Sequence, residues 1–408
     1  MTARELLEAN WVETPAAGYT RPTTDGLYPH QWNWDSAFAA LGWAALDPRR
    51  AWAELTSLAG MQGEDGSVPH LAYSAAPQLY FPSADWWPPR WGRDGRRISG
   101  ISQPPVFATC LRLILERDGG DHHDAARPLL TPLLRWHEWW LRDGGPVVVH
   151  PWETGRDNAP DWDAALEPIP VLDVDDQRDD TRWVGVDQRP QHRDYGRYAY
   201  LVMELRAGEP PSFRVFDPGV ASILSAACHD LAWVAERLGD TTAASTAQNQ
   251  AERAEERLKA RADPSGLARA EDLTTGRRVA TAGAGWALNV LRPSLDDDAL
   301  DRLEHACLHD EDALAAPYGV RSWPRADDRF DPRRYWRGPV WASITWLCAL
   351  GFERHGRRGT AVALRERLAA AVDAAGHREF VDGDTGEGLG AHGFTWTAAL
   401  DAWCSAHR

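Results

Sequence analysis

The chain has 408 residues, with 60 acidic and 44 basic side chains, so its formal net charge is −16 at neutral pH. A nucleic-acid partner needs a basic surface, and this charge argues against one. No apolar run reaches the ~18 residues of a membrane helix. The first residues, MTARELLEANW, lack a basic patch followed by an apolar core, so we expect no membrane partner, no secretion signal and a cytoplasmic location.

Cysteine and tryptophan are the two informative residue types. The five cysteines are scattered and never form a C-x-x-C pair, which favours a reducing compartment and argues against a disulfide framework or a zinc–thiolate site. There are 22 tryptophans, more than most cores need, because each buried indole must find an acceptor for its N–H. Either a tryptophan-rich core or a sugar pocket walled with aromatic rings would explain this number.

Apolar residues recur at helical spacing through most of the chain. PVVVH, at 146–150, is the clearest strand signal. With no linker, no change in composition and no repeat of fixed period, the chain is expected to form one all-α domain, residues 1–408, made of helix pairs. The helices are expected at 35–46, 49–61, 104–118, 124–142, 194–207, 217–239, 241–262, 294–308, 338–354, 357–375 and 394–406.

The connections between these helices are uneven, and four of them stand out. Residues 62–103, 144–193 and 311–337 are long and rich in Trp, Pro, Arg and Asp, and 376–393 is rich in glycine. Long connections in a compact domain usually carry function. We therefore expect a helical scaffold that holds a pocket rimmed by aromatic and acidic loops.

Residues 76–101, within the first of these connections, place Tyr80, Trp86, Trp87 and Trp91 among prolines and glycines. Such a segment fits a lid that closes over the pocket and excludes water. It fits equally well a static surface loop packed by its own indoles.

Common cofactor and metal signatures are absent from the sequence. There is no Walker A loop, no G-x-G-x-x-G opening a helix, no H-E-x-x-H and no G-x-S-x-G elbow. DGDTGEG, at 382–388, imitates the start of a calcium loop, but its twelfth position is Gly393 where a closing Glu is needed. We therefore expect neither a cofactor nor a metal.

The segment HPWETGRDNAPDWD, residues 150–163, combines four acids with two tryptophans. Cleaving a glycosidic bond needs one acid to protonate the leaving oxygen and a second carboxylate to activate water or to attack carbon. The acid must keep its proton near neutral pH, which requires a desolvated place. Asp157 fits this role, while a loop acid that caps a turn or pairs with Arg156 is the ordinary alternative.

The second carboxylate should come from another loop. Glu379 in HREFVDGDTGEG precedes the glycine-rich turn and is a candidate, although a helix-terminal Glu paired with His377 or Arg378 is the ordinary alternative. Residue types alone do not choose among the acids. The competing positions are Glu153, Asp161, Asp163, Asp382 and Glu387.

Six segments between about residues 25 and 403 occur together in one order: YPHQWNWDSAF, ISQPPVFA, HPWETGRDNAPDWD, QRPQHRDYGRY, YWRGPVWASITW and TGEGLGAHGFTWTAAL. Together they resemble glycoside hydrolase family 63, most closely its small bacterial members, the mannosylglycerate and glucosylglycerate hydrolases. The resemblance implies an (α/α)6 barrel with long active-site loops. It also implies an active site at one mouth of the toroid and an inverting mechanism on an α-linked sugar.

The resemblance also assigns roles to residues whose motifs match. It makes Asp157 the general acid and Glu379 the general base. At the bottom of the pocket it places Trp32, Trp34 and Asp35. In the walls it places Trp152, Arg156, Trp336 and Trp341. Around the leaving group it places Tyr28, Tyr80, Gln103, Arg189, Tyr195 and Tyr335.

The expected function is hydrolysis of a small-molecule sugar substrate, glucosylglycerate or mannosylglycerate, by an inverting α-glycosidase. A trehalase-like or oligosaccharide α-glucosidase on the same fold is the nearest alternative, and a sugar-binding protein without catalysis is the alternative of another class. Two departures from the family's motifs concern the leaving group: Phe380 follows the base where a Tyr is usual, and ETG replaces the commoner ESG. The sequence leaves the choice of sugar and the oligomeric state open.

Overall fold

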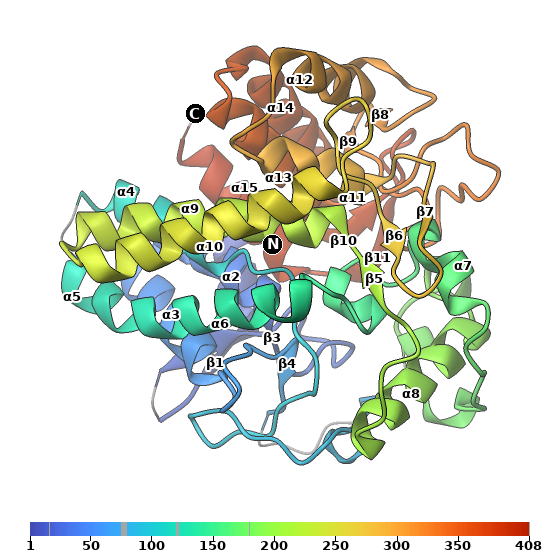
Figure 1. The fold of residues 1–408 in the computed structure, drawn as a ribbon, viewed down its shortest axis with the longest axis horizontal. Coiled ribbons are helices and arrows are strands. Elements are labelled where there is room, and N and C mark those ends of the chain that lie inside the picture. The colour runs from blue at the N-terminus through green and yellow to red at the C-terminus, as the bar shows by residue number, and fades with distance from the viewer. Residues whose placement is uncertain (16, 75–79, 120–121, 179, 408) are drawn as a thin grey trace.

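The computed structural model describes residues 1–15, 17–74, 80–119, 122–178 and 180–407. Residues 76–79, at the start of the segment considered above as a lid, lie outside the described residues. The described chain is mostly helical, with short two- and three-stranded sheets between the helices (Figure 1). None of its helices is long and apolar enough to span a membrane.

An inner ring of helices closes on itself, because each member contacts the next and the last contacts the first. A helix that is apolar all round is buried, and α2 shows this with an unbroken buried run from Asn33 to Ala44. The ring consists of α2 (Asn33–Leu46), α4 (Phe107–Arg117), α9 (Pro218–Arg237), α11 (Ala284–Ala287) continued by η9 (Leu288–Leu291), α13 (Ala342–Arg354) and α15 (Thr395–Ser405).

An outer helix precedes each inner one along the chain. Outer helices are buried on one side only; in α10 the buried positions are chiefly small alanines at spacings of three and four residues, which allows close packing on α9. This alternation is an (α/α)6 barrel and confirms the expected fold class. The outer helices are α1 (Ala3–Asn10), α3 (Pro48–Gly60), α6 (Leu130–Leu141), α10 (Thr241–Ala260), α12 (Asp297–Glu304) and α14 (Arg358–Ala375).

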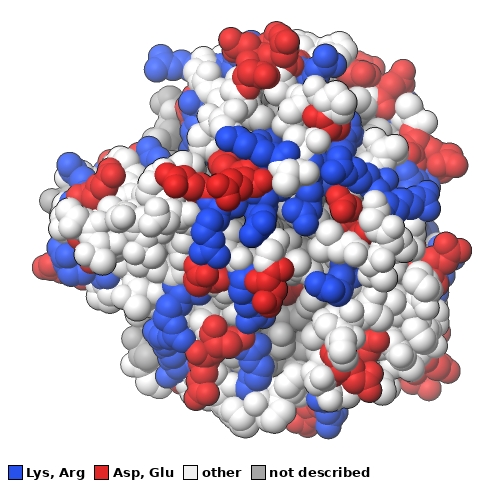
Figure 2. All heavy atoms as spheres, in the orientation of Figure 1, with Lys and Arg blue, Asp and Glu red and all other residues white. Residues whose placement is uncertain are grey.

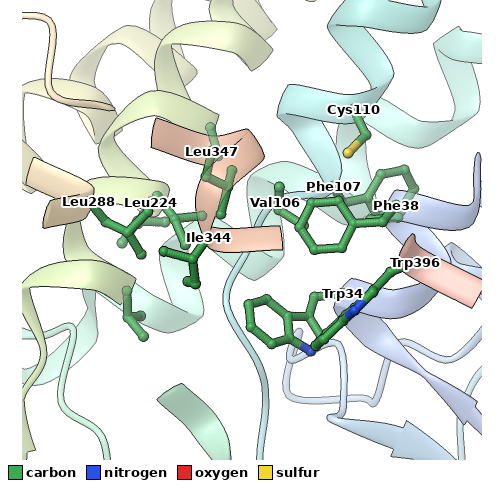
Figure 3. Close-up of a cluster of buried hydrophobic side chains, with 14 of the residues drawn as sticks. Trp34, Phe38, Val106, Phe107, Cys110, Leu224, Leu288, Ile344, Leu347 and Trp396 are labelled. Atoms are coloured by element: carbon green, nitrogen blue, oxygen red, sulfur yellow. The ribbon is translucent and has the colours of Figure 1, made fainter. Parts of the chain in front are cut away.

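Side chains from the whole inner ring meet around the barrel axis (Figure 3). They are apolar and buried, so the barrel is a filled core and not a channel. Trp34 and Trp396, at the edge of this cluster, also line the pocket described below. The labelled members are Trp34, Phe38, Val106, Phe107, Cys110, Leu224, Leu288, Ile344, Leu347 and Trp396.

Short helices and hairpins in the long connections surround the inner-helix ends. The longest addition is α8 (His192–Ala207), with α5 (His123–Ala126) and α7 (Asp163–Leu166) much shorter. All paired strands are antiparallel. The strand pairs are β1 (Trp11–Glu13) with β2 (Gly18–Thr20), β3 (Gln31–Trp32) with β4 (Leu71–Ala72), β5 (Val215–Phe216) with β6 (Glu271–Asp272), β6 with β7 (Arg277–Arg278), β8 (Ala315–Ala316) with β9 (Gly319–Val320), and β10 (Arg378–Val381) with β11 (Gly388–His392).

Three expectations about the elements need correction. The strand over 146–150 is wrong: only Val148 pairs, in an isolated bridge to Val215, because the chain turns at Pro151 into a short 3-10 helix. The helix over 124–142 is interrupted by a 3-10 turn around Pro128, which cannot donate a helical hydrogen bond. The helix over 294–308 begins at Asp297 and ends in a π-helical turn, 305–309.

Acidic and basic side chains are interspersed over the face shown in Figure 2. Neither sign forms a continuous surface there, although the net charge is −16. A pocket that selects a charged ligand must therefore owe its electrostatic potential to charged groups in its own lining.

Candidate active site

A pocket of about 860 Å³, including its open mouth, lies at the N-terminal ends of α2 and α15. The long connections supply most of its walls, as their composition suggested. The structure brings all but two of the expected site residues together here. They are Tyr28, Trp32, Trp34, Asp35, Tyr80, Gln103, Trp152, Asp157, Arg189, Tyr195, Tyr335, Trp336 and Glu379.

Arg156 and Trp341 were expected in the wall but lie behind it. Arg156 is buried and bound by two carboxylates, with both oxygens of Asp217 at 2.7 Å and Asp161 at 3.2 Å. Trp341 stacks face to face on Trp336, with ring centroids 3.8 Å apart. Trp341 thus supports Trp336 from behind, and Arg156 ties its loop to Asp217, so their expected contact with substrate is corrected to a supporting position.

Several pocket residues were not singled out from the sequence. Phe394 and Trp396 stand in one of the matching segments, GFTWTAAL, at the start of α15, and that segment is the signal that could have found them. The others come from loops whose meeting depends on the fold. They include His70, Phe81, Arg178, Asp180 and Trp183.

The acids of the 150–163 segment have different partners. Glu153 accepts hydrogen bonds from the backbone N–H groups of Ser102 and Val149, at 3.1 and 2.7 Å. Asp161 binds Arg156, and Asp163 forms a two-pronged ion pair with Arg337. These three acids therefore hold the loop in place.

Asp157 is the exception, because within the described chain it forms no ion pair and accepts no hydrogen bond from another side chain. Burial raises the pKa of Asp157 to about 7, although the positive charge of Arg189 acts in the opposite direction. Its own carbonyl accepts a 3.1 Å hydrogen bond from the Tyr198 hydroxyl, which fixes the backbone. A carboxyl group with this pKa holds a proton near neutral pH and can donate it.

Gly155 lets the loop approach α2 closely enough to place Asp157 in the pocket. Its φ of 66° lies in the left-handed region that favours glycine, and a Cβ atom there would meet the Trp34 ring at 2.5 Å. Any larger residue would push the loop away from Trp34. The glycine in ETGRDN is thus required both by its positive φ and by the close contact with Trp34.

Glu379 lies on β10, buried in the pocket. Its Oε1 accepts a 2.7 Å hydrogen bond from Tyr28 and lies 3.5 Å from Nη1 of Arg189, and its Oε2 accepts from the Ala391 N–H at 2.9 Å. Burial raises the pKa of Glu379, while Arg189, Ala391 and Tyr28 act to lower it. Neighbouring donors of this kind hold a carboxylate in place without protonating it.

The other acids near Glu379 are used locally. Asp382 accepts from the backbone N–H groups of Asp384 and Thr385, which caps its own turn. Asp384 binds Arg321, and the exposed Glu387 binds Arg333 at 2.6 Å. The turn that imitates a calcium loop is therefore held by these contacts, and no group of three or more acidic, Cys or His side chains among the described residues could hold a metal.

The floor of the pocket is aromatic and carries one further acid. Burial raises the pKa of Asp35 to about 8, so this carboxyl group is largely protonated at neutral pH. Trp34 packs edge-on against Trp396, with centroids 5.2 Å apart, and the backbone N–H of Trp34 contacts the Gln103 side chain at 3.4 Å. A floor of indole rings with one hydrogen-bonding carboxyl group suits a sugar ring, which has both C–H faces and hydroxyl groups.

One side of the pocket gathers tyrosines around a single arginine. Arg189 donates to the hydroxyls of Tyr28 at 2.8 Å and Tyr195 at 3.3 Å, and its guanidinium lies 4.4 Å from the ring centre of Tyr335. Tyr335 has a φ of 44°, an unusual value for a residue with a side chain. Strained backbone of this kind is concentrated at functional sites, where the surrounding structure maintains it.

The arrangement can therefore offer a proton from Asp157 and a carboxylate at Glu379 inside one aromatic pocket. Those are the two groups that hydrolysis of a glycosidic bond requires. The arginine and its tyrosines provide a separate polar region beside Glu379. The residue pattern and the geometry agree on glycoside chemistry.

Comparison with known proteins decides the family. Residues 28–397 match the family model for the mannosylglycerate hydrolase MGH1-like glycoside hydrolase domain. The chain belongs to this family. This glycoside hydrolase is therefore an inverting α-glycosidase, as the resemblance in its sequence implied.

Relatives match this glycoside hydrolase over nearly its full length. A mannosylglycerate hydrolase from Thermus thermophilus is 35% identical, with 98% of this chain and 99% of that protein covered. A glucosylglycerate hydrolase from Mycolicibacterium hassiacum is 33% identical, with 91% of each covered. The crystal structure of the family 63 mannosylglycerate hydrolase from Thermus thermophilus in complex with Tris and D-glycerate superposes with a TM-score of 0.86 at 35% identity, covering 99% of this chain and 98% of that one.

Proposed function

We propose that this glycoside hydrolase releases glycerate from an α-glycoside of glycerate, either glucosylglycerate or mannosylglycerate. The observation that carries the proposal is the position of Arg189 among Tyr28, Tyr195 and Tyr335, directly beside Glu379. A guanidinium pairs well with a small carboxylate. The names of the relatives, which include both sugars, support the glycerate half and leave the sugar open.

Asp157 is proposed as the general acid and Glu379 as the general base. A group with a pKa of about 7 can protonate the leaving oxygen at neutral pH. Glu379, fixed by three donors, would take a proton from the attacking water. An inverting enzyme needs room for that water and separates the two carboxyl groups by roughly 6.5–9.5 Å.

The remaining pocket residues are proposed to divide between the two halves of the substrate. Asp35, Trp32 and Trp34 would hold the sugar ring at the bottom, with Trp152 and Trp336 as walls. The polar region would hold glycerate. Its proposed members are Tyr28, Tyr80, Gln103, Arg189, Tyr195 and Tyr335.

A panel of α-glycosides tests the proposal. We expect kcat/KM on glucosylglycerate or mannosylglycerate to be roughly ten- to a hundredfold higher than on the matching glycerol glycoside. This ratio corresponds to the free energy of one charge-assisted hydrogen bond. Trehalose should be a poor substrate. Equal efficiency on the acid and the glycerol glycoside, or a preference for trehalose, would overturn the glycerate assignment.

Proton NMR of the same reactions follows the released sugar. Inversion of an α-glycoside gives the β-anomer first, before mutarotation. An initial α-anomer would contradict the roles proposed for Asp157 and Glu379.

The cytosol is the proposed location. Cys110, Cys228, Cys307 and Cys348 are buried and form no disulfide bond. A reducing compartment keeps such thiols free. Fractionation of cells that produce the protein, followed by activity assays on each fraction, tests this assignment.

A further inference from the structure

Two arginines on the leaving-group side of the pocket share one carboxylate, Asp180, which the proposed reaction leaves without a role. Asp180 opens the short turn Asp180–Arg182 and is 9% exposed. Its Oδ2 accepts from Nε of Arg189 at 3.0 Å and from Nη2 of Arg178 at 2.9 Å, and its Oδ1 accepts from Nε of Arg178 at 3.1 Å. All three side chains line the pocket.

We propose that Asp180 is a positioning residue that aims Arg189 at the carboxylate of the leaving acid, an inference that rests on the proposed function. A guanidinium has five N–H donors in a rigid plane. Asp180 engages Nε, which fixes that plane and directs Nη1 to Tyr28 and Glu379 and Nη2 to Tyr195. Among the described residues these contacts leave one N–H, on Nη2, for a ligand.

The negative charge of Asp180 is needed because two cations occupy one buried corner. Arg178 lies 3.8 Å from the ring centre of Tyr195, and Arg189 donates to the hydroxyl of the same tyrosine. Two buried guanidinium groups so placed repel each other unless a carboxylate lies between them. Burial acts to raise the pKa of Asp180, but Arg189 and Arg178 hold it below its usual value, so Asp180 is ionised at neutral pH.

Asp180 also limits how closely Arg189 approaches the proposed base. Nη1 of Arg189 stands 3.5 Å from Oε1 of Glu379, longer than the 3.0 Å bond from its Nε to Asp180. Without Asp180, Glu379 would be the strongest acceptor near Arg189. The arginine would then pair with the base and turn away from the leaving acid.

Product inhibition tests this role, because glycerate and the free sugar are separate products whose inhibition constants are measured independently. In Asp180→Asn we expect the inhibition constant of D-glycerate to rise roughly tenfold or more, the loss of about one charge-assisted hydrogen bond. The constants for D-glucose and D-mannose should stay within about twofold of wild type, because the sugar subsite is separate. A general loss of packing would weaken both kinds of product alike.

Asp327→Asn is the matched control. Asp327 accepts two hydrogen bonds from Arg329, two residues further along the chain, just as Asp180 accepts two from Arg178. Asp327 does not line the pocket. The control should leave the constants for glycerate and for the sugars unchanged. Melting temperatures of both variants report any effect on folding.

The possible results are distinct. Unchanged glycerate inhibition in Asp180→Asn, or equal weakening of glycerate and sugar, would overturn the positioning role. If Asp180→Asn does not fold, Asp180→Glu keeps the charge but displaces it by one methylene, and it must weaken glycerate selectively. If glycerate does not inhibit the wild-type enzyme at all, the proposed function fails, and the inference fails with it.

Discussion

The hydroxyl of Tyr28 donates a 2.7 Å hydrogen bond to Oε1 of Glu379 and accepts a 2.8 Å hydrogen bond from Nη1 of Arg189. Tyr28 thus connects the proposed base to the cation that would receive the leaving acid. The hydrogen bond stabilises the ionised form of Glu379, the form that can accept a proton from water. The same contact joins the region proposed to hold glycerate to the carboxylate proposed as the base.

Replacing Tyr28 with Phe should raise the pKa of Glu379, because the charged form loses a donor. The base is then ionised only at higher pH, so the acidic limb of the kcat/KM profile should move to higher pH. We expect kcat/KM to fall roughly tenfold, as for one hydrogen bond to a charged group. A pH series on wild type and variant measures both effects.

Tyr318→Phe is a suitable control for that experiment, since Tyr318 lies outside this pocket's lining. Its pH profile should match that of wild type. An acidic limb that stays fixed in Tyr28→Phe, or moves to lower pH, would contradict a base held by Tyr28.

Glu379→Gln should reduce turnover by about 10²-fold or more, the usual value of one proton-transfer role. Glu387→Gln on the same hairpin is the matched control, because Glu387 is exposed and its side chain binds only Arg333 among the described residues. Its activity should stay near that of wild type. Steady-state rates together with circular dichroism separate lost chemistry from lost structure. Near-normal activity in Glu379→Gln would move the assignment to another acid.

Most helices of the barrel were predictable because apolar residues recur at helical spacing, whereas the barrel itself was expected only from the resemblance to the family. Residues 217–239 and 241–262 were expected as helices, and α9 and α10 follow those ranges within a few residues. The short inner segment Ala284–Leu291 was missed, since eight residues carry too little periodicity. The first helix was missed although Thr2 and Glu5 form a capping box, a signal that the sequence does contain.

The site was predictable where a motif carries it and unpredictable where the fold assembles it. The resemblance singled out Asp157 and Glu379 as the expected acid and base, and the structure places both in one pocket. Asp180 has no motif, because its importance depends on two arginines that reach it from either side. Arg156 shows that a matching motif does not guarantee a place in the pocket. It is next to Asp157 in the sequence, but its side chain points into the core, where it binds Asp217 from another connection.

The described part of the expected lid, residues 80–101, is held mainly from Trp87 onward, where backbone hydrogen bonds join it to Gly60, Gln62, Leu71 and Tyr73. Trp87 is buried with its ring near His70 and His150, and Ile98 pairs with Ala72 in an isolated bridge. Tyr80 contributes to the pocket, with its ring edge-on to the rings of Trp32 and His30. Any closure should therefore be confined to the residues before Trp87.

Hydrogen exchange with and without glycerate and sugar tests that expectation. Amides from 80 to 86 should become protected on binding, because a segment that closes over ligand loses its exposed open states. Amides from 87 to 101 should change little. Equal exchange over the whole segment in both states would show a static loop.

Asp157→Asn should lose turnover of the glycerate glycoside by about 10²-fold or more, because asparagine cannot protonate the leaving oxygen. The pKa of Asp157 is about 7. A general acid works only while protonated, so wild-type kcat/KM should fall as the pH rises above about 7. Asp157→Asn should lack this alkaline limb.

An activated substrate distinguishes the acid from the base. Fluoride leaves with little need for protonation, so an α-glycosyl fluoride of the preferred sugar should bypass Asp157 but still require Glu379 to activate water. We expect Asp157→Asn to retain most of its activity on the fluoride and Glu379→Gln to remain impaired. Comparing both variants on both substrates gives four rates from one set of assays. If the fluoride restored activity to Glu379→Gln and not to Asp157→Asn, the two roles would have to be exchanged. If it restored activity to neither variant, Asp157 would be needed for something other than protonating the leaving group.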